Sequence, residues 1–170
     1  PGSYQLKANS YKLVANIPYN ITSLIIRKFL EEEDKPEIIV LLVQKEVAER
    51  IIAEPGDMSL LAVSVQFYAE AEIVAIVSKE SFFPIPKVDS AIIKLKVKSQ
   101  KPKVQRREFF RLVKFGFAAK RKTLENNLSA GMHIKKDVAR DIIKKAGFEA
   151  KVRAEDLSVE DWIRLFEIIK

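Results

Sequence analysis

The chain has 170 residues, of which 48% are hydrophobic and 31% charged, values typical of one globular domain or of one domain with a small appendix. It contains no Cys and a single His, His133, so disulfides, thiol chemistry, a Cys-based zinc site and a His-rich metal site are excluded and no bound metal is expected. No apolar run approaches the ~20 residues that span a bilayer, and no secretory signal pattern opens the chain. We therefore expect a cytoplasmic protein without membrane contact.

The positive charge is placed unevenly along the chain. Residues 1–100 carry 12 Lys and Arg against 13 Asp and Glu, whereas residues 101–170 carry 18 against 10. The second part therefore holds all of the excess, a net charge of +8. Such asymmetry favours a polyanionic partner, RNA or DNA, contacted mainly by the C-terminal part. A Lys-rich solvated surface would give the same composition.

The first third of the chain has the pattern of an α/β protein. Lys12–Ala15 is predicted to be the end of a buried strand. Ile38–Val43 is a continuous aliphatic run, typical of a strand buried on both faces in a parallel sheet. Between them, Thr22 or Ser23 would cap a helix. Its predicted apolar face consists of Leu24, Ile25, Ile26, Phe29 and Leu30.

Two helices and two strands are predicted next. The helices lie in "QKEVAERIIAEPG" (residues 44–56) and "SLLAVSVQFYA" (59–69). The strands lie in "EIVAIVSKESF" (72–82) and "SAIIKLKVKS" (90–99), and the Pro-rich corner between them predicts antiparallel pairing with a long connection. This order of elements indicates an α/β sheet with helices on its faces.

The character of the sequence changes after residues 99–103. Amphipathic helices are predicted over residues 106–128, 135–146 and 158–169. Gly131 and Gly147 are predicted to end helices, and Ser158 with Asp161 gives a capped start to the last one. We therefore expect an α/β part in residues 1–100 and a basic, RNA-binding helical part in residues 101–170.

The corner "NIPYN" follows the first predicted strand. Ligands of open α/β sheets bind beyond the carboxyl ends of such strands. The Asn16 side chain offers a carbonyl acceptor, and the residue before Pro18 is held extended, which fixes the direction of the Ile17 carbonyl. Tyr19 offers a face on which a base can stack, worth roughly 1–3 kcal/mol per base. Together these groups suit an amino-bearing base such as adenine, although Asn-x-Pro is also a common turn signal.

Three further segments accompany this corner. They are "VQKEVAERIIAEPG" (residues 43–56), "FFPIPKVDSAIIKL" (82–95) and "FAAKRKTLENNL" (117–128). In this order and spacing, from about Lys12 onward, the chain resembles the small-subunit ribosomal RNA adenine dimethyltransferases, which use S-adenosylmethionine. The resemblance implies the C-terminal half of a Rossmann-like methyltransferase sheet, from the fourth strand onward, followed by a small all-helical domain. It also implies N6,N6-dimethylation of two adjacent adenines in 16S-type rRNA, on a 30S assembly intermediate.

Carried over position by position, the resemblance implies roles for five residues. The Asn16 side chain, which in the family also lies beside the cofactor's methionine part, and the Ile17 carbonyl would orient the adenine amino nitrogen. Pro18 would fix the loop, Tyr19 would stack on the base, and Phe82, rather than Phe83, would close over the other face. A base held in this way is flipped out or already single-stranded. Catalysis would then rest on positioning, without a dedicated general base.

The segment "RREFFRLVKFGFAAKRKTL" supplies the predicted contacts with phosphate. Its apolar residues are expected in a core on any interpretation, namely Phe109, Phe110, Val113, Phe117 and Leu124. The predicted RNA contacts, which should weaken steeply with salt, are Arg106, Arg107, Lys114, Lys120, Arg121 and Lys122. His133 is expected in a loop or on the surface, and Trp162 in the core beneath the last helix.

The chain departs from the family at the cofactor site. Family members have a Gly-rich loop after the first strand, whereas this chain has five glycines and no G-x-G pair. We therefore expect a fragment of an enzyme of about 250–270 residues, which alone does not bind S-adenosylmethionine well or methylate RNA. A naturally short RNA-binding relative is the alternative. The bare hydrogen-bonding edge and the uncovered apolar face of the Lys12–Ala15 strand would favour self-association.

Two other functions remain open from the sequence. Macrolide-resistance methyltransferases, which modify an adenine of 23S rRNA, share the "NIPYNI" corner, but the segments at residues 43–56 and 120–128 favour the small-subunit enzymes. A non-catalytic ribosome-assembly or transcription factor on the same fold is the third hypothesis. Since a pure binder need not keep an amino-group clamp, the set of Asn16, Tyr19 and Phe82 argues for catalytic ancestry.

Overall fold

A computed structural model describes residues 11–99 and 102–170, which divide into two compact units. We name residues 11–49 and 68–99 the sheet unit, and residues 50–67 and 102–170 the helical unit. The sequence prediction placed residues 50–67 with the α/β part, whereas the structure groups them with the C-terminal helices. No helix in the described ranges is long and apolar enough to cross a membrane.

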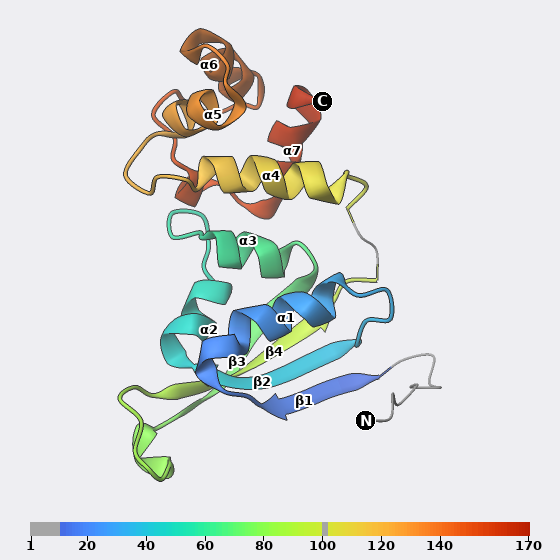
Figure 1. Cartoon of the computed structure of the whole chain (residues 1–170), viewed down its shortest axis with the longest axis vertical. Coiled ribbons are helices and arrows are strands. Elements are labelled where there is room, and N and C mark those ends of the chain that lie inside the picture. Colours follow the sequence, from blue (N-terminus) through green and yellow to red (C-terminus); the bar gives the residue numbers. More distant parts are fainter. Residues whose placement is uncertain (1–10, 100–101) are drawn as a thin grey trace. The chain divides into compact units, whose positions relative to one another are not determined.

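The sheet unit contains four described strands in the order β1-β2-β4-β3 (Figure 1). β1 pairs in parallel with β2, and β4 runs antiparallel to both of its neighbours, β2 and β3. This confirms the predicted α/β class and the antiparallel pairing of the last two strands. Within the described residues, β1 is an edge strand. The strands are β1 (Lys12–Asn16), β2 (Ile38–Gln44), β3 (Ala69–Val77) and β4 (Ser90–Val97).

One face of the sheet forms the core of the sheet unit. The fully buried side chains alternate along the central strands, as the period of two in a β-strand requires. They are Ile39, Leu41, Val43, Ala91, Ile93 and Leu95, joined by Ile26 and Leu30 of helix α1 (Thr22–Glu31).

The prediction that Ile38–Val43 is buried on both faces is wrong for this structure. Ile38, Val40 and Leu42 are only half-buried, because the described residues cover the second face incompletely. Val14 of β1 is 74% exposed, so one face of the first strand is also uncovered within the described residues.

Helix α1 begins without the predicted side-chain cap. A 3-10 turn, η1 (Tyr19–Ile21), runs directly into the helix, and Ile21, not Thr22 or Ser23, occupies the N-cap position. The turn already pairs backbone groups, with the Ile21 amide donating to the Pro18 carbonyl at 3.2 Å. Leu24, predicted on the apolar face, is 68% exposed. Helix α2 (Lys45–Ile51) follows β2, and a short turn, η2 (Lys79–Ser81), follows β3.

The helical unit is built around aromatic side chains. The rings of Phe67 and Phe109 stack with centroids 4.8 Å apart, and Phe166 packs edge-on against Phe109. Trp162 is fully buried, which confirms its predicted place in the core. The helices are α3 (Leu60–Gln66), α4 (Arg106–Gly116), α5 (Leu124–Met132), α6 (Lys136–Lys145) and α7 (Val159–Ile169), with a 3-10 turn η3 (Ala154–Asp156) before the last.

The predicted helix over residues 106–128 is wrong, since α4 and α5 are separate helices joined by residues 117–123. At the break, Gly116 lies so close to Trp162 that a Cβ atom on the glycine would come within 2.2 Å of the indole ring. The Leu124 amide at the start of α5 donates to the Val152 carbonyl at 2.8 Å. These contacts, made by residues distant in sequence, replace the continuous helix that the amphipathic pattern favoured.

The predicted helix ends are partly correct. Gly131 lies inside α5, where the ring of Phe115 leaves no room for a side chain, and does not end the helix. The exposed His133, in the left-handed conformation with φ of 56°, ends it instead. Gly147, with φ of 86°, follows the end of α6 as predicted. The predicted capping box of Ser158 and Asp161 is confirmed at the start of α7.

Candidate functional site

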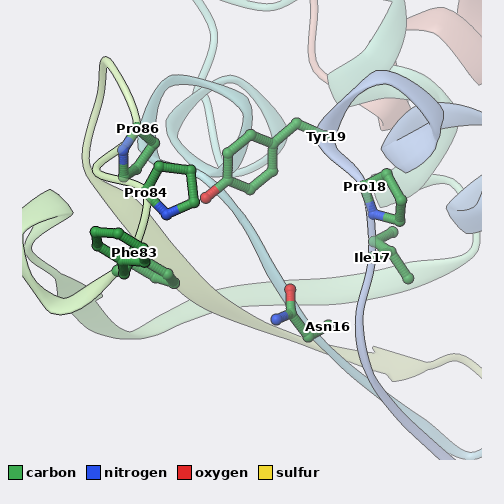
Figure 2. Close-up of a pocket in the computed structure, with 8 residues that line it drawn as sticks. Asn16, Ile17, Pro18, Tyr19, Phe83, Pro84 and Pro86 are labelled. Carbon is green, nitrogen blue, oxygen red and sulfur yellow. The ribbon is translucent and has the colours of Figure 1, made fainter.

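A pocket of about 420 Å³ lies at the carboxyl end of β1 in the sheet unit. One side is formed by residues 16–19, and the other by the segment between η2 and β4 (Figure 2). The eight described residues that line it include all five predicted from the sequence for base binding. The lining residues are Asn16, Ile17, Pro18, Tyr19, Phe82, Phe83, Pro84 and Pro86.

Asn16 is the last residue of β1, and it carries the polar group of the first wall. The alternation of a strand turns its side chain to the exposed face of the sheet. Figure 2 shows the amide directed toward the space between Tyr19 and Phe83. In residues 11–99, no hydrogen-bonding partner holds this amide, so both its oxygen and its nitrogen are available to a ligand. Pro18, with φ of −56°, then turns the chain into η1.

Tyr19 is fixed by a hydrogen bond that the sequence did not predict. Its hydroxyl lies 2.7 Å from the hydroxyl oxygen of Ser90, a fully buried residue at the start of β4. Because this bond holds one end of the ring and η1 holds the other, the ring face is set in a fixed orientation. The only hint in the sequence was a small polar residue at the start of an apolar strand, and it did not identify the partner.

The neighbouring Asp89 connects two further segments to the same point. Its carboxylate accepts a hydrogen bond from the Lys79 amide at 3.1 Å, and its carbonyl accepts one from the Lys45 amide at 3.0 Å. Asp89 and Ser90 therefore join η2, the start of α2 and the Tyr19 wall. The relative position of the two pocket walls depends on this pair of residues.

The second wall is aromatic and more exposed than the first. Phe82 is half-buried, whereas Phe83 is 100% exposed, and the peptide bond from Phe83 to Pro84 is cis. Both rings line the pocket. The sequence-based choice of Phe82 over Phe83 as the stacking wall therefore stays a prediction.

The lining residues define what the pocket can bind. It offers aromatic rings on both sides and the Asn16 amide, and none of the eight described lining residues carries a carboxylate, an ammonium or an imidazole group. Such a set suits a flat, uncharged ring that carries hydrogen-bonding groups on its edge. With Asn16 as its one unpaired polar side chain, this set does not make a cradle for the hydroxyls and charged groups of S-adenosylmethionine.

The predicted phosphate contacts are all exposed on the helical unit. Arg106, Arg107 and Lys114 lie on α4, and the other three lie in the segment after it. Sequence reasoning missed Arg111, which is also exposed. At spacings of four and three residues, Arg107, Arg111 and Lys114 share one face of α4.

That face lies opposite the buried side of α4, which consists of Phe109, Leu112, Val113 and Gly116. The Arg111 guanidinium lies over the ring of Phe115, 5.4 Å from its centroid, which holds the long side chain against the helix. The helical period of the sequence alone would have identified Arg111, because it falls midway between two predicted contacts.

Comparisons with known proteins show which family the chain belongs to. A sequence model of the family described as "Ribosomal RNA adenine dimethylase" matches residues 4–170. The chain is 46% identical over 154 residues to ribosomal RNA small subunit methyltransferase A of Dehalococcoides mccartyi strain 195, covering 89% of this chain and 53% of the relative. It is 43% identical over 169 residues to the protein of the same name from Clostridioides difficile, covering 97% and 58%.

Two solved structures share the fold. A dimethyladenosine transferase from Plasmodium falciparum superposes with a TM-score of 0.78 at 26% identity, over 95% of this chain and 67% of that structure. The 23S rRNA methyltransferase ErmE gives 0.74 at 26% identity, over 98% and 68%. The chain spans about half the length of the curated relatives it matches. Since the family match extends over almost every residue, this chain belongs to the ribosomal RNA adenine dimethylase family.

Proposed function

We propose that the protein acts as a ribosomal RNA adenine N6,N6-dimethyltransferase on two adjacent adenines of small-subunit rRNA, with S-adenosylmethionine as methyl donor. The observation that carries this proposal is the pocket at the end of β1, where an unpaired Asn16 amide lies between two aromatic walls. In a family of adenine dimethylases, an uncharged pocket of this kind suits the target base.

The pocket residues orient the base by stacking and by hydrogen bonds. The adenine ring lies between Tyr19 and Phe82, and before the first transfer the Asn16 side-chain oxygen and the Ile17 carbonyl accept the two hydrogens of the amino group. The first methyl group replaces one of these hydrogens and the second methyl group replaces the other. The hydrogen bonds draw the nitrogen lone pair out of conjugation with the ring and direct it toward the methyl donor. Because orientation supplies the rate enhancement, no side chain needs to remove a proton before the transfer.

S-adenosylmethionine supplies the methyl group in this proposal, but the described residues do not build its site. Asn16 alone among the pocket residues has a free polar side chain, and the sequence has no Gly-rich loop. Asn16 is therefore the one pocket residue proposed to lie beside the methyl donor. The 170-residue chain by itself should bind S-adenosylmethionine weakly and methylate no RNA.

The helical unit binds the RNA in this proposal. Its exposed cations contact phosphates, which gives affinity without sequence information. The pocket then selects an adenine that is unpaired in a 30S assembly intermediate. The exposed Val14 and the edge of β1, which pairs with no second strand among the described residues, make self-association of the isolated chain part of the proposal.

Methyl transfer to under-methylated 30S particles tests the proposal. The protein, expressed at the full length of its coding sequence, should transfer two methyl groups to each of two adjacent adenines, and Asn16→Ala should slow the transfer by about 100-fold or more. The 170-residue chain should show no micromolar binding of S-adenosylmethionine in calorimetric titration. A full-length protein that binds 30S particles without methylating them would instead support a non-catalytic assembly factor.

A second candidate is methylation of 23S rRNA, which the structural similarity to ErmE favours. Incubation of the same preparation with protein-free 23S rRNA distinguishes the two candidate substrates. If 23S rRNA is methylated and 30S particles are not, the small-subunit assignment is overturned. If 30S particles are methylated and 23S rRNA is not, the assignment is supported.

A further inference from the structure

The segment between α4 and α5, residues 117–123, is named here the basic turn. It carries three consecutive exposed cations, Lys120, Arg121 and Lys122. It has no helix or strand of its own, so its shape depends on contacts made by its backbone. Those contacts come from both α4 and α5.

Asn127 of α5 makes the central contact. Its side chain is buried, with 4% exposed, and its amide nitrogen donates to the Gly116 carbonyl at 2.6 Å and to the Ala119 carbonyl at 3.1 Å. The last carbonyls of an α-helix have no partner within the helix. One side chain therefore pairs the carbonyl at the end of α4 and a carbonyl inside the basic turn.

Further hydrogen bonds fix the rest of the basic turn. The Lys122 backbone amide donates to the Ala119 carbonyl at 3.0 Å. Ala119, which is hydrogen-bonded to Asn127, therefore also fixes the backbone of Lys122, the last cation of the turn. At the other end of the turn, the side-chain amide of Asn126 donates to the Thr123 hydroxyl at 2.8 Å. The three cations thus project from a backbone that is fixed on both sides.

Long cationic side chains on a mobile loop lose more entropy on binding than the same side chains on a fixed backbone. A fixed turn presents its charges to consecutive phosphates at a constant spacing. We propose that Asn127 is a positioning residue for RNA binding, which acts by holding the basic turn through the Gly116 and Ala119 carbonyls. This inference rests on the proposed RNA-binding role of the helical unit.

Two variants test the donor directly. Asn127→Ala removes the amide, and the isosteric Asn127→Asp replaces the donor with a carboxylate that faces two carbonyls. Fluorescence anisotropy of the 170-residue chain with a small-subunit rRNA hairpin, measured over a range of salt concentrations, gives affinity and the number of phosphate contacts. The salt slope is the slope of the logarithm of RNA affinity against the logarithm of salt concentration, and it reports the number of phosphate contacts. For each variant we expect about a tenfold loss of affinity and a salt slope that corresponds to about one contact fewer.

Glu125→Gln is the matched control. Glu125 lies on the same helix, and the change loosens a part-buried pair, because the Glu125 carboxylate accepts two hydrogen bonds from the half-exposed Arg140 at 3.0 and 3.1 Å. Neither bond involves the basic turn. The variant should lower thermal stability while leaving the salt slope unchanged. An equal change of slope in Glu125→Gln would show that general loosening of α5, rather than the Asn127 donor, controls binding.

A double-mutant cycle separates positioning from a purely structural role. In a chain that already carries Lys120→Ala, Arg121→Ala and Lys122→Ala, Asn127→Ala should cause no further loss of RNA affinity. An equal loss in both backgrounds would overturn the inference. If Asn127→Ala does not fold by circular dichroism, Asn127→Ser, which keeps a short donor, takes its place in the cycle with the same two outcomes.

The test also distinguishes failure of the inference from failure of the proposed function. A wild-type chain that does not bind the hairpin overturns the inference, even if the full-length protein methylates RNA. A wild-type chain that passes the cycle supports the inference, even if the full-length protein transfers no methyl group.

Discussion

In the proposed function, the pocket and the basic turn recognise two different parts of a nucleic acid with opposite kinds of surface. The pocket is lined by uncharged residues, and its proposed means of selection are ring stacking and the directed Asn16 amide. The basic turn exposes three full charges and hides the polar side chain, Asn127, that shapes it. Base selection should therefore be insensitive to salt, and phosphate binding should depend on it. Variants of the two regions should separate turnover from affinity.

The largest effect is expected from Asn16→Ala in the full-length protein. Loss of one oriented hydrogen-bonding group in an active site lowers turnover by about 100-fold or more. RNA affinity and its salt slope should stay unchanged. Single-turnover methylation and anisotropy on the same preparation measure both. Asn20→Ala, a change of the same kind at an exposed residue outside the pocket lining, is the control.

Removing the cations should have the converse effect. The triple variant Lys120→Ala, Arg121→Ala and Lys122→Ala should lose RNA affinity by roughly 10- to 100-fold at low salt, and its salt slope should fall by about two. Turnover at saturating RNA should change little. The same number of exposed lysines removed elsewhere, at Lys144, Lys145 and Lys151, controls for net charge. An equal loss there would mean that total charge, rather than the turn, determines binding.

A smaller effect is expected at the bond that fixes the Tyr19 ring. Ser90→Ala removes a hydrogen bond worth about 1 kcal/mol, so turnover should fall several-fold up to about tenfold. Tyr19→Phe should give the same loss, and the double variant should be no worse than either single one. Additive losses would show that the two hydroxyls act independently. The salt slope should not move in any of the three.

The smallest effect concerns acid stability of the helical unit. The hydrogen bond from Arg140, helped by the guanidinium charge and opposed by burial, lowers the pKa of Glu125 below its ordinary value of 4.5. The stability from this pair is therefore fully present above pH 4.5 and is lost as the pH falls through the lower folded pKa. Thermal unfolding followed between pH 6 and pH 3 should show a steeper decline for wild type than for Glu125→Gln. Parallel declines would contradict this assignment.

Much of the fold followed from local pattern. Alternating and continuous apolar runs predicted the strands, because every strand must bury at least one face. The prediction of one helix over residues 106–128 was wrong, because the break in that segment depends on contacts that no local pattern contains. The contact between Gly116 and Trp162 is one of them. Gly131 was misassigned for the same reason. A glycine is required there because the ring of Phe115 leaves no room for a side chain, and not because a helix ends.

The site divides in the same way. Asn16, Tyr19 and Phe82 were predictable because the chain resembles a known family at those residues, and the structure brings them around one pocket. Their catalytic roles stay predictions. Ser90 and Asn127 were not predictable, because their contribution lies in a partner distant in sequence or in a backbone carbonyl. Side chains that hold other residues in place leave little trace in a single sequence.

The order of the sheet has a consequence for the width of the pocket. The first wall continues from β1, the second wall leads into β4, and β2 lies between these two strands and pairs with both. None of the eight described lining residues belongs to β2. The strand acts as a spacer that separates the backbones of β1 and β4 by two inter-strand distances, about 9–10 Å. A substitution in the core of β2, at Leu41 for example, can therefore change which rings fit without touching any residue that contacts them.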